Sequence, residues 1–405
     1  MTTATAARPQ LAYLSDQIQQ LKDKGTHFKL RVLEDEQEPV CTFDGKKVIN
    51  LASNNYLGLT THPKLREAAL AATKKYGVGS GAVRTIAGTM KIHMQLEEKI
   101  ARFKNVEACV VFQSGFAANA GTVSAILGKE DFIISDELNH ASIIDGARLS
   151  RAKILVFRHK DVAHAEEQLA SIQDQPGHKL LITDGVFSMD GDIGPLPALC
   201  ALAEKYGAIM MVDDAHASGV LGKNGRGTID HFNVHGRVDV QVGTLSKAIG
   251  ALGGYVCGSR DLIDFLYHRA RPFLFSTSHP PSVAATCIAA FEVLESEPER
   301  IEKLWQNTRY FKKELGSLGF NIGGVTTPAS ETPITPIIVG EGKLAMEFSR
   351  QLFKEGVMAT GIAFPTVAEG KARIRTIMTA THTQSQLAQA LETLERVGKN
   401  MKIIS

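Results

Sequence analysis

Short apolar runs alternate with helix-length amphipathic segments through the middle of the chain. Segments such as Leu196–Lys205 separate runs that are too short for helices and have the length of strands. Strands that alternate with helices form a mainly parallel sheet covered on both faces, so the pattern predicts an α/β fold with functional side chains at the carboxyl ends of the strands. The runs are Ala108–Phe112, Phe132–Ile134, Ile154–Phe157, Leu180–Ile182, Ile209–Val212, Val238–Val242 and Tyr255–Cys257.

The two ends of the chain have other patterns. Leucine and isoleucine recur at three- and four-residue steps from Leu11 to Leu21, which predicts a helical arm that ends at Gly25 and lies on another surface. Val48–Leu59 has the pattern of a short strand that runs into a polar turn. A long helical pattern from about Val283 to Leu315 is interrupted near Glu297 and Pro298.

Beyond these helices, shorter elements predict a smaller α+β lobe. Strands are expected near Pro336–Val339 and Arg373–Ile377, and helices near Leu344–Glu355 and Thr383–Val397. The chain therefore divides into an N-terminal arm and segment (1–60), a large domain that holds the parallel sheet (61–290) and a small C-terminal domain (291–405).

Composition narrows the class of partner. The 405 residues are 44% hydrophobic and 22% charged, as in ordinary globular proteins. The 45 basic and 43 acidic residues give a net charge of +2, which indicates neither nucleic acid nor an anionic membrane as a partner. A small-molecule substrate is the expectation.

The cysteines and the lengths of the apolar runs indicate where in the cell the protein is expected. The five cysteines are far apart and lack the paired spacing of a zinc site or a disulfide framework, which fits a reducing cytoplasm. Met1–Arg8 lacks a charged start followed by an apolar core, and no apolar stretch approaches the roughly 20 residues of a membrane span. The chain is expected to be cytoplasmic and not embedded in a membrane.

Lys247 lies among small and hydroxyl residues at the end of an apolar run, in Val242–Gly250. The hypothesis is that Lys247 forms a Schiff base with pyridoxal 5′-phosphate (PLP), although a lone lysine is usually a solvated surface charge. The glycine-rich stretch Tyr76–Thr85 has the wrong spacing for a nucleotide-binding fingerprint or a P-loop. Thr183–Asp192 is rich in carboxylates and glycines, but it does not match a calcium-binding EF-hand loop, so no metal is expected.

Three further motifs follow predicted strands. Ser114–Asn119 opens a helix, where free backbone N–H groups bind phosphate, although it could be an ordinary turn. His140 offers a flat imidazole to a planar cofactor, or it could be a structural histidine. A buried Asp213 would keep a pyridine nitrogen protonated while His216 meets the phenolic oxygen of the cofactor; metal ligation is the alternative, but no third ligand is evident.

Together these motifs resemble those of the α-oxoamine synthases, PLP enzymes of aminotransferase fold type I. The resemblance extends from Asn54–Gly58 to Arg373–Thr376 and is most specific in three motifs. These motifs are Asn139–Ser142, Asp213–His216 and Thr244–Lys247. Within the family, Ser135–Gly146 and Phe273–Ser276 most resemble glycine C-acetyltransferases, also called 2-amino-3-ketobutyrate CoA ligases, and the chain also resembles 8-amino-7-oxononanoate synthases.

The resemblance implies a role for each catalytic residue. Lys247 would carry the cofactor and then remove the α-proton of the amino acid. Asp213 would pair with the pyridine nitrogen, and His216 would bind the 3′-oxygen. His140 would stack on the ring and also contact the substrate by assisting the thioester oxygen.

Other residues are implied to hold the cofactor or the substrate. Asn54 and Arg375 would bind the substrate carboxylate, for which an arginine fork is well suited, although Arg375 could be a solvated charge at a strand edge. Residues implied to line or bind the cofactor, the last two from across a homodimer interface, are Gly115, Phe116, Ser188, Thr244, Ser276 and Thr277.

The resemblance implies acyl transfer from an acyl-CoA to an amino acid. The main expectation is that glycine and acetyl-CoA give 2-amino-3-oxobutanoate and coenzyme A. The alternative is alanine with a pimeloyl thioester, with decarboxylation to 8-amino-7-oxononanoate, or a broad-specificity synthase. Gly115 stands where the glycine C-acetyltransferase pattern has a cysteine, which leaves the acyl specificity open. A PLP aminotransferase and a catalytically idle ligand-binding protein are two further hypotheses.

Overall fold

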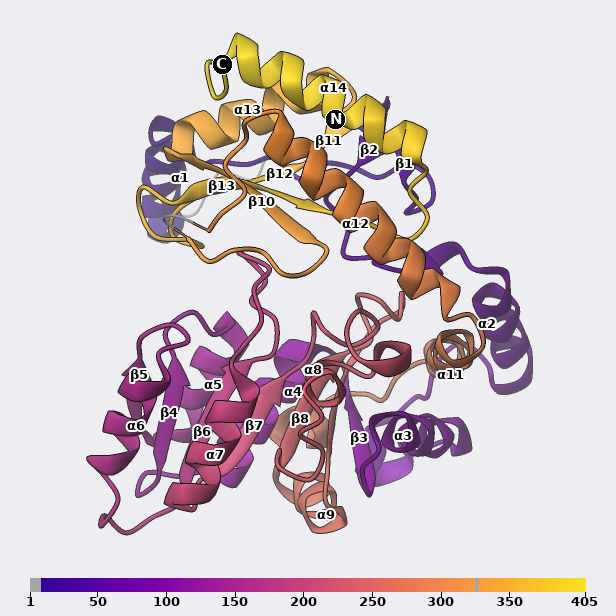
Figure 1. Ribbon diagram of the computed structural model, residues 1–405. Coiled ribbons are helices and arrows are strands. Elements are labelled where there is room, and N and C mark those ends of the chain that lie inside the picture. Colours follow the sequence, from indigo (N-terminus) through magenta and orange to yellow (C-terminus); the bar gives the residue numbers. More distant parts are fainter. Residues whose placement is uncertain (1–8, 325–326) are drawn as a thin grey trace.

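A seven-stranded sheet forms the centre of the larger of two lobes in the computed structural model (Figure 1). The structure describes residues 9–324 and 327–405; Met1–Arg8, where no export signal was predicted, lies outside them. The strand order is β3-β9-β8-β7-β6-β4-β5. The strands are β3 (Ala108–Phe112), β4 (Phe132–Asp136), β5 (Lys153–Phe157), β6 (Lys179–Asp184), β7 (Ile209–Asp213), β8 (Val240–Thr244) and β9 (Gly254–Gly258).

Most of this sheet is parallel, as the alternating pattern predicted. Neighbouring pairs among β4 to β8 run parallel, whereas β9 is antiparallel to both β3 and β8. The insertion of β9 between β3 and β8 was not predicted. Because β3 and β8 both oppose β9, they share one direction, and the carboxyl ends of β3 to β8 lie at one edge of the sheet.

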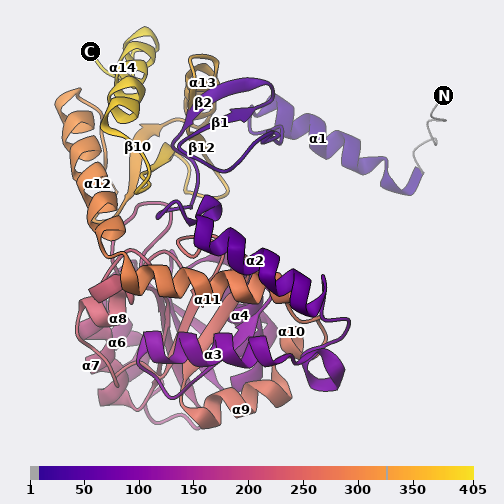
Figure 2. The same ribbon diagram turned by 90° about the vertical axis from the view of Figure 1, so that its right-hand side faces the viewer.

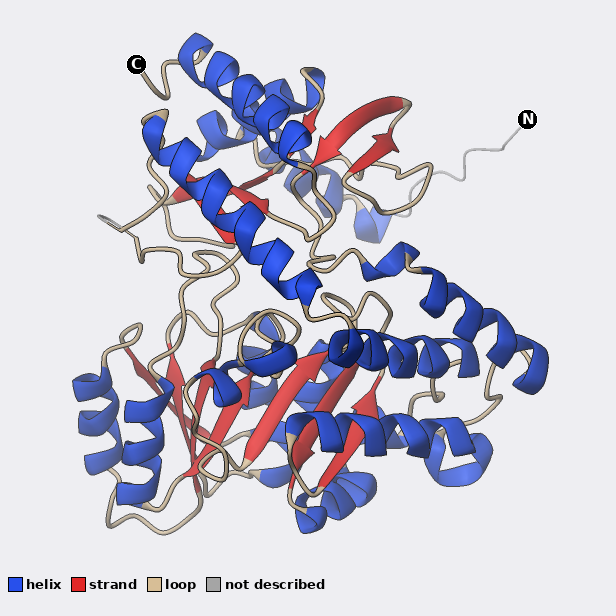
Figure 3. Ribbon diagram, turned by 45° about the vertical axis from the view of Figure 1, so that its right-hand side comes forward, coloured by secondary structure: helices blue, strands red, loops and turns tan. Residues whose placement is uncertain are grey.

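Layers of helices cover both faces of the sheet (Figure 3), and alternate residues of β7 face opposite layers. Met211 of β7 packs with α4 (Gly115–Ile126), α5 (Ala141–Ser150) and α9 (Arg260–Arg269), whereas Met210 and Val212 pack with α6 (Val162–Ala170) and α7 (Leu196–Tyr206). This alternation follows from the two-residue period of a strand. Both faces are covered, so the strands read as continuous apolar runs.

Three helices cover the end of the sheet near β3 and lead toward the smaller lobe (Figure 2). They are α2 (Pro63–Tyr76), α3 (Lys91–Lys104) and α11 (Pro281–Ser296). The interruption predicted near Glu297 and Pro298 is confirmed, since α12 (Glu299–Ser317) begins after Pro298. The short helices α8 (Thr228–His231) and α10 (Arg271–Leu274) complete the larger lobe.

The smaller lobe combines segments from both ends of the chain. One antiparallel sheet has the order β10-β13-β12, and a second has the order β1-β2-β11, so an N-terminal hairpin pairs with a C-terminal strand. The division at residues 60 and 290 stays a prediction. The elements are β1 (Val40–Phe43), β2 (Lys46–Asn50), β10 (Ile334–Gly340), α13 (Gly342–Lys354), β11 (Val357–Met358), β12 (Thr360–Ile362), β13 (Ala372–Ile377) and α14 (Gln384–Asn400).

The predicted N-terminal helix is present as α1 (Tyr13–Asp23), which projects from the smaller lobe (Figure 2). None of its residues is buried, so its apolar side chains are exposed. None of the helices in residues 9–324 and 327–405 is long and apolar enough to cross a membrane. The same residues contain no group of three or more His, Cys, Asp or Glu side chains suited to a metal ion.

Candidate active site

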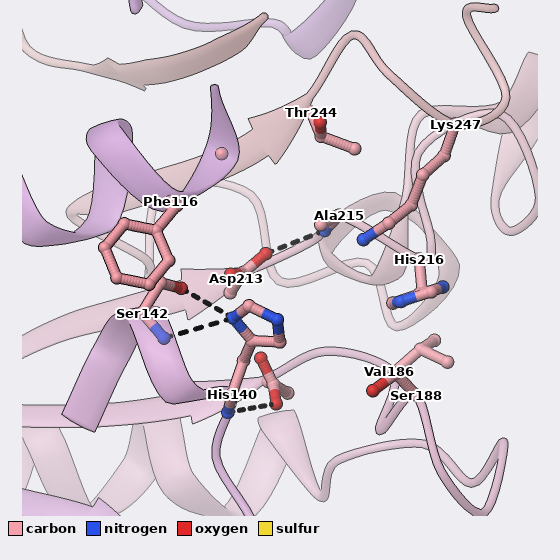
Figure 4. Close-up of a pocket in the computed structure, with 12 residues that line it drawn as sticks. Phe116, His140, Ser142, Val186, Ser188, Asp213, Ala215, His216, Thr244 and Lys247 are labelled. Atoms are coloured by element: carbon pink, nitrogen blue, oxygen red, sulfur yellow. Dashed lines mark hydrogen bonds between the residues drawn. The ribbon is translucent and has the colours of Figure 1, made fainter. Parts of the chain in front are cut away.

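A cavity of about 210 Å³ lies at the carboxyl edge of the large sheet (Figure 4). It brings together residues that follow five different strands, as expected for a mainly parallel sheet. The lining residues are Gly115, Phe116, His140, Ser142, Asp184, Val186, Ser188, Asp213, Ala215, His216, Thr244 and Lys247. Most of the predicted site residues are therefore in one cavity.

Lys247 follows β8 and directs its amine into this cavity (Figure 4). Burial of the ammonium group lowers the pKa of Lys247 to about 8, although the nearby carboxylates of Asp213 and Asp184 act in the opposite direction. A lowered pKa makes the neutral, nucleophilic amine accessible near neutral pH.

Asp213 is the last residue of β7, and its carboxylate is buried. Its Oδ2 accepts a hydrogen bond from Asn119 Nδ2 at 2.5 Å, and its Oδ1 accepts one from the Ala215 amide at 2.9 Å. In the described part of the chain no salt bridge includes Asp213. A buried carboxylate held by neutral donors alone is suited to a cationic ligand group.

Asn119 is a site residue that the sequence reasoning missed. It lies inside the apolar helix α4, and its Nδ2 also donates to Ser142 Oγ at 2.9 Å. A polar amide in an otherwise apolar helix was the available signal, because a buried amide needs hydrogen-bond partners.

His140 caps the N-terminus of α5. The Ser142 amide donates to His140 Nδ1 at 3.2 Å, so the proton of the neutral ring lies on Nε2. The surrounding protein, by desolvating the ring, lowers the pKa of His140, and the positive charge of Lys247 adds to this effect. The His140 backbone N–H donates to Asp184 Oδ2 at 2.9 Å. His140 is thus held as a neutral imidazole with a free N–H.

Asp184 is a second missed residue, although the Thr183–Asp192 stretch was considered for calcium. It ends β6, and its backbone N–H donates to Asn139 Oδ1 at 2.8 Å. Burial raises the pKa of Asp184 well above its usual range, and the negative charge of Asp213 raises it further.

His216 is paired with Tyr56, a third missed residue. The Tyr56 hydroxyl and His216 Nδ1 lie 2.8 Å apart, and both side chains are buried. Burial lowers the pKa of His216 well below its usual range, with Lys247 and Arg375 adding to the effect. Tyr56 belongs to the Asn54–Gly58 motif, but that motif was used only to assign Asn54.

The first turn of α4 forms another wall of the cavity. Ser114 Oγ caps this helix by accepting from the Ala117 amide at 3.0 Å, which leaves the amides of Gly115 and Phe116 at the open end of the helix. A Cβ at Gly115 would approach Thr244 Cβ to 3.5 Å and occupy cavity space. The Thr244 hydroxyl donates to the Gly253 carbonyl at 2.9 Å.

Four predicted residues do not line the cavity: Asn54, Ser276, Thr277 and Arg375. Arg375 in β13 nevertheless donates from Nη1 to the carbonyl of Ser188 at 3.1 Å, and burial lowers its pKa. Asn54 Oδ1 is buried without a partner in the described residues. Ser276 is half-buried and Thr277 exposed.

These features fit PLP. Lys247 supplies an amine for a Schiff base, and the buried carboxylate of Asp213 is suited to a protonated nitrogen. The backbone amides of Gly115 and Phe116, in the first turn of α4, are suited to an anion. The amine of Lys247, the carboxylate of Asp213 and the backbone amides at the start of α4 are therefore complementary to the aldehyde, the protonated pyridine nitrogen and the phosphate of the cofactor, respectively.

Comparison with known proteins identifies the family. The profile of the class I and II aminotransferases matches residues 46–394. The chain is 57% identical over 392 residues to an 8-amino-7-oxononanoate synthase from Symbiobacterium thermophilum, covering 97% of this chain and 99% of the relative.

Two solved structures are also similar. A serine palmitoyltransferase from S. paucimobilis with bound PLP and myriocin is 31% identical, with a TM-score of 0.91 and coverage of 99% of this chain and 100% of that chain. An 8-amino-7-oxononanoate synthase from Francisella tularensis is 30% identical, with a TM-score of 0.72 and coverage of 87% and 98%.

The main expectation of glycine and acetyl-CoA as substrates is wrong, because the full-length relatives at 54–57% identity are 8-amino-7-oxononanoate synthases. Of the two motifs used for that expectation, Ser135–Gly146 contributes His140 and Ser142 to the cavity and Phe273–Ser276 contributes no lining residue, so neither defines an acyl pocket. The cofactor is PLP, as predicted. The chain belongs to the class I and II aminotransferase family, and within it to the α-oxoamine synthases, which are PLP-dependent acyltransferases.

Proposed function

We propose that this protein is an 8-amino-7-oxononanoate synthase that joins alanine to a pimeloyl thioester and releases coenzyme A and carbon dioxide. The main support for the type of reaction is that Lys247, Asp213 and a neutral His140 line the same cavity. The choice of substrates rests on the relatives at 57% and 56% identity, both of which are 8-amino-7-oxononanoate synthases.

Arg375 and Asn54 would hold the carboxylate of alanine. Arg375 uses Nη1 to contact the Ser188 carbonyl, and its other donors remain available for a bidentate contact with a carboxylate. Its partial burial strengthens such a contact, because less water competes with the ion pair.

Lys247 would act as the base. When bound, PLP supplies an aldehyde for the amino group of the substrate and a protonated ring that accepts electron density from the α-carbon. Lys247, with a pKa of about 8, takes the α-proton as the neutral amine. It later returns a proton to the same carbon.

Two histidines would contribute to the reaction, His140 as a hydrogen-bond donor to the substrate and His216 as a contact of the cofactor. His140 donates from Nε2 to the thioester oxygen as negative charge develops there, since its Nδ1 is occupied by the Ser142 amide. His216, which is held by Tyr56, would bind the 3′-oxygen of the cofactor. Asp213, which is held by Asn119, would balance the charge on the pyridine nitrogen.

The proposed reaction balances in atoms and charge. The α-carbon of alanine forms a bond to the thioester carbonyl carbon, and the carbon–sulfur bond breaks. The departing thiolate takes up a proton to become coenzyme A. The bond from the α-carbon to its carboxylate then breaks, carbon dioxide leaves, and a proton replaces it.

The remaining assignments concern the cofactor and a second subunit. Gly115, Phe116, Ser188 and Thr244 would line or bind the cofactor from within one subunit. Ser276 and Thr277 would reach the phosphate in a homodimer.

Surface chemistry near Thr277 supports the homodimer. Thr277 forms an antiparallel bridge with Val83, and the same region exposes Val78 (80%), Ile86 (83%) and Phe275 (69%). Large apolar side chains so fully exposed in one region are typical of a protein interface.

Release of coenzyme A from four substrate pairs tests the proposal. Alanine and glycine are each combined with pimeloyl-CoA and acetyl-CoA. We expect the highest kcat/KM for alanine with pimeloyl-CoA, together with labelled carbon dioxide from carboxyl-labelled alanine. A higher kcat/KM for glycine with acetyl-CoA, or product that retains the label, would contradict the proposal.

Lys247→Ala tests the assignment of the base. We expect loss of the absorbance band near about 420 nm that a lysine-bound PLP produces, and a decrease in coenzyme A release of at least about 10²-fold. Lys153→Ala, which changes an exposed lysine in β5, is the matched control and should retain both. Full turnover by Lys247→Ala would reject the assignment.

A further inference from the structure

The loop between β6 and α7, residues 185–194, carries Ser188 into the cavity and is here named the Ser188 loop. Two backbone hydrogen bonds close it on itself: the Phe187 amide donates to the Asp192 carbonyl at 3.0 Å, and the Gly191 amide donates to the Phe187 carbonyl at 2.8 Å. These bonds link Phe187, beside Ser188, to Gly191 and Asp192, so contacts at Asp192 bear on the position of Ser188.

The smaller lobe holds one side of this loop. Arg373 Nη1 donates to Asp190 Oδ1 at 2.5 Å and to the Met189 carbonyl at 3.1 Å. Arg375, two residues later on the same strand, donates to the Ser188 carbonyl at 3.1 Å. The guanidinium proposed to bind the substrate carboxylate is thus oriented by a backbone carbonyl of the loop.

His159 holds the other side from the larger lobe. Its Nδ1 lies 3.0 Å from Asp136 Oδ1, and its Nε2 lies 2.9 Å from Asp192 Oδ2. Asp136 ends β4 and Asp192 belongs to the loop, and both carboxylates are buried. Ionised carboxylates only accept hydrogen bonds, so both ring nitrogens must carry protons and His159 is an imidazolium.

Charged groups of both signs surround His159, and carboxylates outnumber the single ammonium group. Lys160 Nζ lies 3.2 Å from Asp192 Oδ2 and 3.4 Å from Glu331 Oε2, and Glu137 accepts from the His159 amide at 2.8 Å. The Phe187 ring packs nearly perpendicular to the imidazole, with centroids 4.4 Å apart. Burial of the ring opposes protonation, but the two carboxylates raise the pKa of His159 to about 9.

We propose that His159 is a positioning residue for substrate binding: by bridging Asp136 and Asp192 it fixes the Ser188 loop and, through the Ser188 carbonyl, the orientation of Arg375. The inference rests on the proposed role of Arg375. Loss of the bridge would then weaken binding of a carboxylate with little effect on the later chemical steps, since His159 does not touch the cavity.

Propionate is a suitable probe, because it has the carboxylate of alanine but no amino group that titrates between pH 7 and 10. Its inhibition constant, measured as competition with alanine in the holoenzyme, reports the carboxylate site alone. For His159→Asn we expect this constant and the KM for alanine to rise about tenfold, as for a coupling residue without ligand contact, with kcat within about twofold of wild type. His178→Asn, at an exposed histidine, is the matched control and should change neither.

The pH profile separates positioning from a general loss of structure. In wild type the inhibition constant of propionate should stay level up to about pH 8 and rise through about pH 9, where His159 loses its proton. This rise should be absent in His159→Asn. Asp192→Asn removes one of the two carboxylates that favour the imidazolium, so the rise should begin at a lower pH.

If His159→Asn does not fold, the pH midpoint of propionate inhibition in Asp192→Asn still tests the positioning role of His159. Unchanged propionate inhibition in a folded His159→Asn, or an unchanged pH midpoint in Asp192→Asn, overturns the inference. Failure of the proposed function would look different: wild type itself would then release no coenzyme A from alanine and pimeloyl-CoA.

Discussion

Buried polar residues next to the cavity hold the cavity-lining residues in position. Lys104 Nζ contacts Asp214 Oδ2 at 3.0 Å and Ser218 Oγ at 3.2 Å, and both members of the ion pair are almost fully buried. Asp214 follows Asp213 directly, so this pair anchors the segment that carries Asp213 and His216 to the end of α3.

Lys104→Met should lower the free energy of unfolding by about 3–5 kcal/mol, because it leaves the Asp214 carboxylate buried without a cation. Urea denaturation measures the change. Arg102→Met removes an exposed ion pair with Glu98 on the same helix and should cost less than about 1 kcal/mol. Equal losses in the two variants would contradict this account of the buried pair.

Tyr56→Phe should lower the unfolding free energy by about 1 kcal/mol and reduce the rate of coenzyme A release. The hydroxyl is lost, and His216 Nδ1 then has no partner to fix its orientation. Tyr206→Phe, which removes a hydroxyl bonded to Glu166 far from the cavity, should leave the rate unchanged. A rate in Tyr56→Phe equal to wild type would show that His216 needs no such partner.

His159 should also make stability depend on pH. Its pKa is raised from 6.5 to about 9 in the folded state, so its contribution is fully present below pH 6.5 and is lost as the pH rises through about 9. The difference in unfolding free energy between wild type and His159→Asn isolates this effect. The subtraction also cancels the contributions of Lys247 and Lys312. Their lowered pKa values of about 8 make the unfolding free energy rise with pH, which is opposite to the effect of His159.

Urea denaturation of both proteins at several values between pH 6 and pH 10 provides the comparison. We expect the difference to be largest below pH 6.5 and to shrink toward pH 9. A difference that does not vary with pH would mean that folding does not raise the pKa of His159.

At the scale of elements, the sheet and the first turn of α4 build the site together. The carboxyl ends of parallel strands meet at one edge, and the capped helix α4 begins at that edge with free amides. Ser114 fixes the first turn of this helix, since its Oγ accepts from the Ala117 amide.

Ser114→Ala should cost about 1 kcal/mol of stability, as for other lost N-caps, and should also weaken retention of PLP during dialysis. Ser259 caps α9 in the same way, by accepting from the Leu262 amide at 3.2 Å, but does not line the cavity. Ser259→Ala should therefore lose similar stability and retain PLP as wild type does. Equal retention in both variants would argue against a phosphate site at α4.

At the scale of the whole molecule, exposed apolar side chains favour association of two chains. Ile86 is 83% exposed and lies close to Thr277, whose proposed role requires a second subunit. The apolar stripe of α1 is exposed as well, so its predicted contact surface is not provided by the described residues of one chain.

Wild type should sediment as a dimer, and Ile86→Lys should shift the protein toward monomer by placing a charge in the apolar surface. Sedimentation velocity at matched concentrations measures the shift. Val156→Lys, at an exposed position on the edge strand β5, is the control and should leave the dimer intact. A monomeric wild type with full coenzyme A release would exclude the role given to Ser276 and Thr277.

The order of apolar runs and amphipathic segments was enough to predict the α/β architecture and many of the residues that end its strands. Buried strands in a mainly parallel sheet are continuously apolar, and the polar residues that follow them gather at one edge. The common location of Asp213, His216 and Lys247 was therefore predictable, whereas the roles given to them came from the family resemblance. A local pattern carries this information because the two-residue strand period and the alternation of strands with helices are local properties, whereas the position of the antiparallel β9 was not predicted.

Only the tertiary structure decided which groups support those residues. Tyr56 meets His216 across 160 positions, Asn119 meets Asp213 across 94, and His159 meets Asp192 across 33. No periodicity in the chain encodes such pairs, because they depend on how separate elements pack. The same reason explains why the sequence motifs predicted the cofactor but favoured the wrong acyl donor. The residues proposed to contact the cofactor lie at strand ends, whereas the shape of an acyl pocket depends on how separate elements pack.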